Sequence, residues 1–133
     1  MRYPGILLLL ALSPNAPALA ADCANAMTQA DMNICAGNAA KAADSELNRL
    51  YAQMQARLRN SPSGKAALVS AQRSWIAFRD SECRFAASGV EGGSMMPMMA
   101  SNCVEDLTRR RSADFKRYLA CAEGEVGCPV PGN

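Results

Sequence analysis

Six cysteines follow an apolar leader in a chain that contains no histidine, and this combination limits the folds and activities open to it. An even number of cysteines in an exported chain is typical of a disulfide-bonded scaffold. The lack of histidine removes the commonest general base and the commonest zinc ligand. The composition therefore argues against an enzyme, and we expect no cofactor and no metal. The cysteines are Cys23, Cys35, Cys83, Cys103, Cys121 and Cys128.

Residues 1–20 have the parts of a signal peptide. An arginine precedes an apolar run over residues 6–12 that is too short to cross a bilayer, and Ala18-Leu19-Ala20 fits the small-x-small pattern of a signal peptidase site. We expect cleavage after Ala20. The residue before Cys23 is an aspartate rather than a small residue, which argues against a lipoprotein anchor. The sequence thus predicts a soluble periplasmic or secreted protein that is not inserted in a membrane after cleavage.

The rest of the chain is one small domain by the usual size range. The formal net charge is +2 for the whole chain and falls to +1 when the arginine of the leader is removed. This near-balance gives no general attraction to nucleic acid or anionic lipid. We expect a helical domain over residues 21–122 with a modest core, followed by a tail over residues 123–133 that a disulfide closes.

Three segments have the composition and spacing of helices. In the first, Thr28 followed by Asp31 resembles a capping box, and helix-forming residues continue without proline to Asn60. Gly37-Asn38 either bends this helix or interrupts it. Its apolar stripe at helical spacing contains Leu47, Leu50, Tyr51, Met54 and Leu58.

The second and third helices follow after short turns. Ser61 or Ser63 is available as the next N-cap, and the second helix is expected from about Lys65 to Ala87. The third begins near Pro97 and continues to about Ala122. No convincing strand pattern occurs, so we predict an all-α, up-down-up helical bundle braced by disulfides. The predicted inward residues are Leu68, Ala71, Trp75, Phe78 and Cys83, then Cys103, Leu107, Phe115, Tyr118 and Leu119.

Six cysteines allow fifteen pairings, and the helix layout favours one of them. The first two cysteines lie just before and inside the first helix, so a bond between them would hold the N-terminal segment against it. The hairpin between the second and third helices places Cys83 and Cys103 at the same height on adjacent helices. A bond between the last two cysteines would close a small ring in the tail. No CxxC spacing is present, which argues against a redox-active or metal-binding set. The predicted disulfides are Cys23–Cys35, Cys83–Cys103 and Cys121–Cys128.

A series of motifs runs through these helices in a fixed order. They are TQADMNIC from Thr28 to Cys35, Ala43-Asp44 with Leu47-Asn48 and Tyr51, AQRSWIAFRDSEC from Ala71 to Cys83, Gly92-Gly93-Ser94, Cys103, and Thr108 with Arg111. Together they resemble the LprI family, over the mature chain to about Leu119. That family consists of small exported bacterial proteins named for a lysozyme inhibitor, so the resemblance implies a protein that binds and inhibits lysozyme.

Two segments depart from the family pattern. The tail with Cys121 and Cys128 extends beyond it, and the methionine cluster, Met95-Met96-Pro97-Met98-Met99, stands where mixed apolar and aromatic residues are expected. Thioethers are soft ligands, so the cluster could hold Cu(I) in an envelope copper-binding protein. Methionines also fill irregular apolar gaps and form adaptable contact surfaces, which is the simpler interpretation.

One face of the second helix combines polar and aromatic side chains. Gln72, Trp75 and Arg79 recur at helical spacing, and Arg79 could stack on Trp75. A partly buried pair between Asp44 and either Arg79 or Arg111 would satisfy charges that the core penalises. We therefore predict a structural network of Asp44, Gln72, Trp75, Arg79 and Arg111.

Catalysis has weak support in the same motifs. Asp44, Asp80 and Glu82 are the nearest carboxylates for glycoside hydrolysis, but Asp80 and Glu82 are not helical neighbours. No serine has a nucleophile motif or an adjacent base. The basic run over residues 109–111 is more typical of a solvated helix face than of a nucleic-acid site.

The sequence therefore predicts a non-catalytic exported protein that binds another protein, with lysozyme inhibition implied by the resemblance. A rigid projection that covers a substrate cleft is sufficient for inhibition. The loop between the second and third helices is the candidate projection, and a structural or immunity partner of a secreted effector is an alternative. The predicted partner-binding residues are Glu91, Gly92, Gly93 and Ser94.

Overall fold

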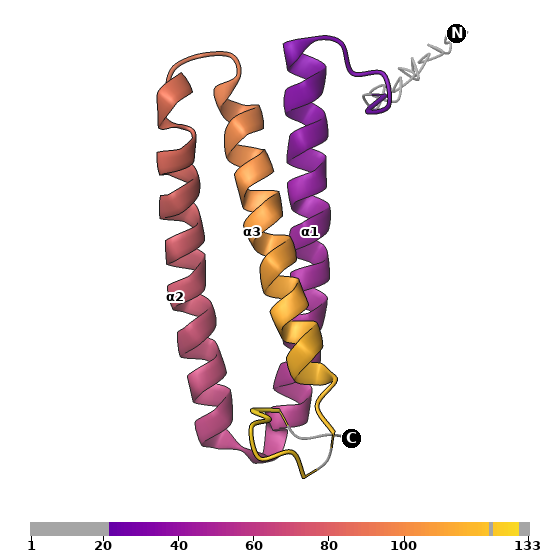
Figure 1. Cartoon of the computed structure of the whole chain (residues 1–133), viewed down its shortest axis with the longest axis vertical. Helices are drawn as coiled ribbons and strands as arrows, with labels where there is room; N and C mark the ends of the chain where they lie inside the picture. Colours follow the sequence, from indigo (N-terminus) through magenta and orange to yellow (C-terminus); the bar gives the residue numbers. More distant parts are fainter. Residues whose placement is uncertain (1–21, 123, 131–133) are drawn as a thin grey trace, which may run out of the picture.

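The computed structural model describes residues 22–122 and 124–130, and all regular structure in this part of the chain is helical. The predicted signal peptide and its cleavage site lie outside the described residues. Consecutive helices run in opposite directions, as predicted for an up-down-up bundle: in Figure 1, α1 descends, α2 ascends and α3 descends. The elements are α1 (Gln29–Arg57), the 3-10 turn η1 (Leu58–Asn60), α2 (Pro62–Ala86), the 3-10 turn η2 (Ser88–Val90) and α3 (Met96–Leu119).

α1 is continuous because its sequence favours a helix along its whole length. The hydroxyl of Thr28 accepts a hydrogen bond from the backbone N–H of Asp31 at 3.1 Å, so the predicted N-cap is confirmed. Gly37-Asn38 does not interrupt the helix. After Arg57, the 3-10 turn η1 carries the chain to Asn60, the residue at which the sequence predicted the end.

α2 and α3 have boundaries that differ slightly from the prediction. Ser61 caps α2 by accepting a hydrogen bond from the N–H of Gly64 at 3.3 Å, and Pro62 occupies the first turn, where its missing N–H costs nothing. The helix therefore begins before Lys65, because the proline assigned to the turn belongs to the helix. α3 ends at Leu119, before the predicted Ala122.

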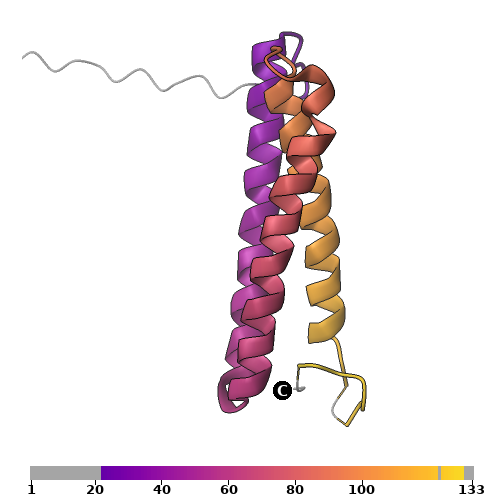
Figure 2. The same ribbon diagram turned by 90° about the vertical axis from the view of Figure 1, so that its left-hand side faces the viewer.

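α1 packs mainly against α3, and small side chains allow the two helices to approach closely. Ala36, Ala40 and Ala43 are buried on α1, and Thr108 and Ser112 are buried on α3. α2 stands in front of this pair in Figure 2 and packs against α3. The bundle is thus a close helix pair with a third, less tightly packed helix.

The apolar core lies where the end of α1, the start of α2 and the end of α3 meet. Phe115 is fully buried in it, and the tail adds Val130, which is 1% exposed. The tail therefore closes this end of the bundle, a packing role that the sequence did not indicate. The core residues are Leu47, Leu50, Met54, Leu58, Leu68, Phe115 and Val130.

The inward face of α2 is rotated from the predicted one. Ala71 and Phe78 were expected to face inward, but both are exposed, Phe78 to 54%. Gln72, which is buried, and Arg79, which is partly buried, take the inward positions beside Trp75. The spacing was helical as predicted, and the choice of face was wrong at these two positions because polar side chains fill the space between α2 and its neighbours.

Three disulfides brace the structure, with the pairing that the helix layout predicted. Their Cα–Cα distances are 5.4–5.8 Å, in the usual range for this bond. Among the described residues, no cysteine is free. No helix in the described part has both the length and the apolar character needed to cross a membrane. The pairs are Cys23–Cys35, Cys83–Cys103 and Cys121–Cys128.

Candidate functional site

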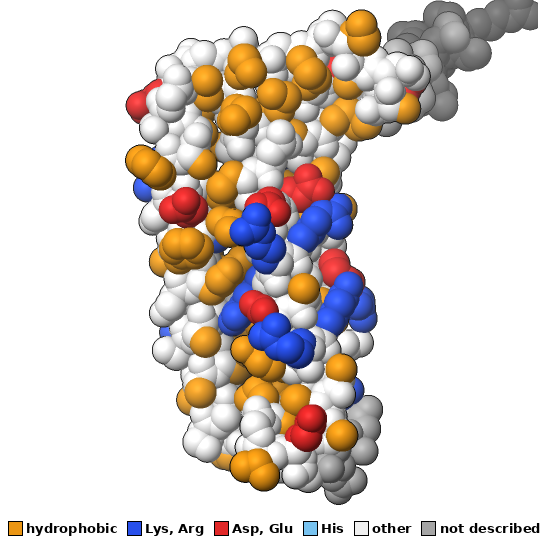
Figure 3. All heavy atoms as spheres, in the orientation of Figure 1, with side chains coloured by type: hydrophobic (Ala, Val, Ile, Leu, Met, Phe, Trp, Pro, Cys, Tyr) orange, Lys and Arg blue, Asp and Glu red, His pale blue; other side chains and the backbone are white. Residues whose placement is uncertain are grey.

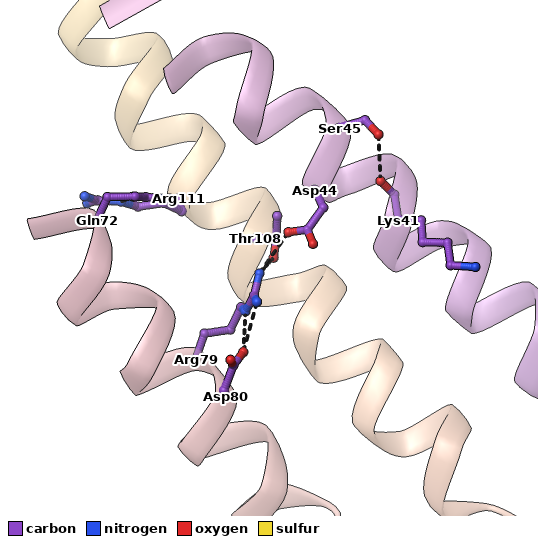
Figure 4. Close-up of polar contacts among 8 residues, drawn as sticks. All are labelled: Lys41, Asp44, Ser45, Gln72, Arg79, Asp80, Thr108 and Arg111. Atoms are coloured by element: carbon purple, nitrogen blue, oxygen red, sulfur yellow. Dashed lines mark hydrogen bonds and ion pairs between the residues drawn. The ribbon is translucent and has the colours of Figure 1, made fainter. Parts of the chain in front are cut away.

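Arg79 on α2 contacts both other helices (Figure 4). Its Nη1 lies 2.8 Å from Oδ1 of Asp44 on α1 and 3.5 Å from the hydroxyl of Thr108 on α3. Its Nη2 forms an ion pair of 2.9 Å with Asp80 on its own helix. The side chain of Arg79 is only 13% exposed, whereas that of Asp44 is 45% exposed. Of the two partners predicted for Asp44, the structure therefore has Arg79.

Trp75 lies between two guanidinium groups. The guanidinium carbon of Arg79 is 5.2 Å from the centre of the Trp75 ring, and that of Arg111 is 6.0 Å away. Arg111 also lies 4.6 Å above the ring of Phe115, and its Nε donates a hydrogen bond to Oε1 of Gln72 at 3.2 Å. Cations above aromatic faces are attracted by the ring quadrupole, so the contacts of Arg111 with Trp75 and Gln72 hold α2 to α3. The five residues predicted as a network thus lie together.

The two carboxylates nearest the motifs face the same guanidinium. Asp44 and Asp80 both contact Arg79, so the two carboxylates share the single positive charge of that guanidinium. A pair of catalytic carboxylates normally flanks a cleft, with one of them kept protonated by its surroundings. Glu82, the third candidate, is exposed near the end of α2. The geometry therefore suits an inter-helix ion pair better than acid–base catalysis.

Glu46 forms a second charged link, between α1 and α3. Its carboxylate accepts hydrogen bonds from Arg49 at 2.8 and 2.9 Å and lies 3.1 Å from Nζ of Lys116. The hydrogen bonds from Arg49, and then those from Lys116, lower the pKa of Glu46 to about 2. The same contact raises the pKa of Arg49.

The basic residues of α3 are balanced by acidic neighbours. Arg109 pairs with Glu105 at 2.7 Å, and Arg110 pairs with Asp106 at 2.7 Å. Blue and red side chains accordingly alternate over the middle of the molecule (Figure 3). Such i, i+4 pairs are typical of a solvated helix face, as the sequence predicted.

The hairpin loop, residues 88–95, presents the predicted partner-binding residues. Glu91, Gly92, Gly93 and Ser94 are all exposed. Consecutive turns fix the backbone, with hydrogen bonds from Gly93 N to Val90 O at 2.9 Å and from Glu91 N to Ser88 O at 3.2 Å. The loop is thus a small, hydrogen-bonded projection at one end of the bundle.

Two backbone features and one side-chain hydrogen bond explain the glycine and asparagine residues at this loop. Gly92 has φ +74°, a conformation that side chains rarely adopt. A Cβ on Gly93 would lie 3.1 Å from the carbonyl oxygen of Val90. Nδ2 of Asn33 on α1 donates a hydrogen bond of 3.0 Å to the carbonyl of Ser94, which ties the loop to the first helix.

The methionine cluster is divided between two helix interfaces. Nε2 of Gln29 on α1 lies 3.8 Å from the sulfur of Met98. Met96 instead lines a hollow of about 310 Å³ together with residues of α2. Met95 and Met99 are exposed to 43% and 39%. This arrangement favours the packing and contact-surface interpretation over convergence of the four sulfurs on one copper ion.

The structure adds two residues to the candidate site that sequence reasoning missed. Phe85, which is 75% exposed, lines the same hollow as Glu91. One indication of Phe85 in the sequence is that it follows Phe78 by seven residues, which puts both rings on one face of α2. Asn33, the anchor of the loop, had no signal beyond its presence in the first motif.

Comparisons with known proteins agree with these features. A family model described as lysozyme inhibitor LprI matches residues 20–115. An uncharacterised protein of Rhizobium meliloti (strain 1021) is 42% identical over 138 aligned positions, which cover 92% of this chain and 99% of the relative. No solved structure gives a significant match.

Proposed function

The chain belongs to the LprI family of lysozyme inhibitors, and on that premise we propose that it is a non-catalytic protein that inhibits a lysozyme by binding to it. The match over residues 20–115 is the observation that carries the proposal. Three disulfides are typical of oxidising compartments, which supports a protein exported from the cytoplasm. The apolar leader further supports a periplasmic or secreted location.

The proposed contact surface is the hairpin loop with the adjoining end of α2. Its backbone is held by turns, by the hydrogen bond from Asn33 and by the nearby Cys83–Cys103 disulfide, so little ordering is required on binding. Phe85 offers a large exposed aromatic anchor beside the carboxylate of Glu91. A projection with a carboxylate and an aromatic ring can cover the cleft of a cationic lysozyme and exclude its substrate.

The carboxylates near the motifs support a non-catalytic role. Asp44 and Asp80 form ion pairs with Arg79, and we propose that these ion pairs stabilise the helices that present the loop. Inhibition by occlusion requires a stable surface and no bond-breaking step. The purified protein is therefore expected to show no lytic activity of its own.

The test is an assay of peptidoglycan lysis by a c-type lysozyme with increasing amounts of the purified, disulfide-bonded protein. We expect lysis to slow as the protein is added. Glu91→Ala combined with Ser94→Ala should weaken inhibition while leaving helicity and melting unchanged, because both residues are exposed on the loop.

The matched control is Ser63→Ala combined with Glu125→Ala, which should inhibit like the unmodified protein. Ser63 is in the first turn of α2 and Glu125 is in the tail, and both of these segments lie at the end of the bundle opposite the hairpin loop (Figure 1). Full inhibition by the loop variant would exclude the hairpin loop as the contact surface. A lack of inhibition across several lysozyme types, at concentrations well above that of the enzyme, would refute the proposed function. That result would favour a secreted effector as the partner.

A further inference from the structure

A second surface, separate from the hairpin loop, lies between α1 and α2. It is a groove of about 380 Å³, within the range of about 300–1,000 Å³ that small-molecule sites occupy. In Figure 2, α2 is nearer the viewer and α1 lies behind it, and the two helices converge toward η1, which joins them. The residues considered below are Asn48, Tyr51 and Gln55 from α1, and Gln72, Arg73 and Ile76 from α2.

Three amide side chains line the groove. Asn48, Gln55 and Gln72 each bring both a donor and an acceptor to one wall or the other. Among the described residues, no hydrogen bond engages the side chains of Asn48 and Gln55, whereas Gln72 is bonded to Arg111. Gln72 uses only its oxygen, in the bond from Arg111, so its NH₂ group is available to a ligand.

The remaining lining residues add a ring and a charge. The ring of Tyr51 is stacked on Phe115 at a centroid distance of 6.2 Å, so the core fixes its orientation, and it stays partly exposed to the groove. Arg73 has no acidic partner in the described part of the chain, in contrast to the paired arginines Arg109 and Arg110. Its guanidinium can therefore bind a carboxylate through two parallel hydrogen bonds.

These groups match the chemistry of one ligand class. Side-chain amides bind hydroxyl and acetamido groups, which also carry both donors and acceptors. An aromatic ring and the apolar side chain of Ile76 suit the C–H face of a sugar. We propose that the groove between α1 and α2 binds a short glycan of acetamido sugars that carries a carboxylate, with Arg73 holding the carboxylate and Asn48 and Gln55 the acetamido groups.

This site is independent of the hairpin loop, so glycan binding and lysozyme inhibition can succeed or fail separately. The test is an NMR titration of the disulfide-bonded protein, in which the side-chain NH₂ signals of Asn48, Gln55 and Gln72 report on the groove. The probes are tri-N-acetylchitotriose, which is neutral, and the disaccharide of N-acetylglucosamine and N-acetylmuramic acid, which carries a carboxylate. A short acidic peptide without sugar is the third probe.

We expect the carboxylated disaccharide to bind most tightly and to shift all three NH₂ signals. Asn48→Ala and Arg73→Ala should each weaken it about tenfold, the effect of removing one hydrogen bond to a charged or well-aligned group. The control is Arg84→Ala, which removes an exposed arginine of the same helix outside the groove and should leave the affinity unchanged.

Three results would overturn the proposal. No shift of the NH₂ signals with either glycan at millimolar concentration would refute the groove as a carbohydrate site. Equal affinity of Arg73→Ala and the unmodified protein for the carboxylated disaccharide would refute the assignment of the carboxylate. Binding of the acidic peptide as tightly as the disaccharide would refute the sugar as the recognised group.

Discussion

At the scale of single residues, the contact of Trp75 with two arginines joins the core to the polar network. The indole packs against the apolar core, and Arg79 and Arg111 lie over its faces. Such contacts lose both apolar burial and cation–π attraction when the ring is removed. Trp75 therefore contributes to stability through both the core and the polar network, although it is only partly buried.

Trp75→Ala is expected to lower the free energy of unfolding by about 3 kcal/mol, the lower end of the range for deleting a large aromatic side chain from a core. Phe78→Ala, on the same helix, is the matched control, because Phe78 is 54% exposed and should cost less than about 0.5 kcal/mol. Urea unfolding of both variants measures the difference. Equal costs for the two would contradict the assigned orientation of α2.

Glu46 predicts a pH dependence. Its pKa in the folded protein is lowered from 4.5 to about 2, so the ionised form is favoured in the fold. The stabilisation is complete well above pH 4.5 and is lost as the pH falls through that value toward about 2. Urea midpoints of the unmodified protein and Glu46→Gln should differ at pH 6 and converge near pH 2, and the difference should shrink in high salt. A constant difference across this range would contradict the assignment.

Helical spacing predicted which side chains share a face, but not which face turns inward. Gln72, Trp75 and Arg79 were placed together correctly, since positions three and four apart are neighbours on any helix. Gln72 faces inward in place of Ala71 because of the rotation of α2 relative to α3. The apolar character of Ala71 predicted the wrong rotation. The choice between Arg79 and Arg111 as the partner of Asp44 likewise depends on how the helices dock.

At the scale of elements, the tail shows where prediction from sequence reached its limit. The ring closed by Cys121 and Cys128 was predicted from the order of cysteines. The burial of Val130 was not, because a short segment without helical spacing gives no sign of where it packs. Helix caps, in contrast, are local, so the sequence predicted Thr28 as a cap and narrowed the second cap to Ser61 or Ser63, of which the structure has Ser61.

Val130→Ala should destabilise the protein by about 2 kcal/mol, the cost of removing two buried methyl groups. Val126→Ala, in the same tail, provides the comparison, because Val126 is fully exposed and its loss should be nearly neutral. Thermal unfolding of the two variants measures both effects. If Val130→Ala were also neutral, the tail would not form part of the core in solution.

At the scale of the whole molecule, α1 and α3 form a closely packed pair, and α2 depends on other attachments. It is joined to α1 through η1 at one end and to α3 through the Cys83–Cys103 disulfide at the other. Between these ends, polar contacts from Gln72 and Arg79 replace the apolar packing of a typical bundle interior. The up-down-up order was predictable from loop lengths, whereas this asymmetry arises from side-chain sizes at the α1–α3 contact.

Removal of the Cys83–Cys103 disulfide by double replacement with alanine should cost about 3 kcal/mol, the loop-closure value for a separation of 20 residues. Removal of the Cys121–Cys128 disulfide, with a separation of 7, should cost about 2 kcal/mol. Urea unfolding under non-reducing conditions compares them. A larger loss for the tail pair would contradict the importance assigned to the link between α2 and α3.

The covalent link between α2 and α3 also affects how the bundle recovers after a local opening. If the contacts of Arg79 break, the disulfide and η1 keep the two surfaces at an effective concentration of about millimolar or higher. The guanidinium therefore meets Asp44 again without a diffusional search through solution. α2 is linked covalently to its neighbours at both ends, so polar contacts along its middle are sufficient to hold it. Each local opening is followed by rapid intramolecular reclosure.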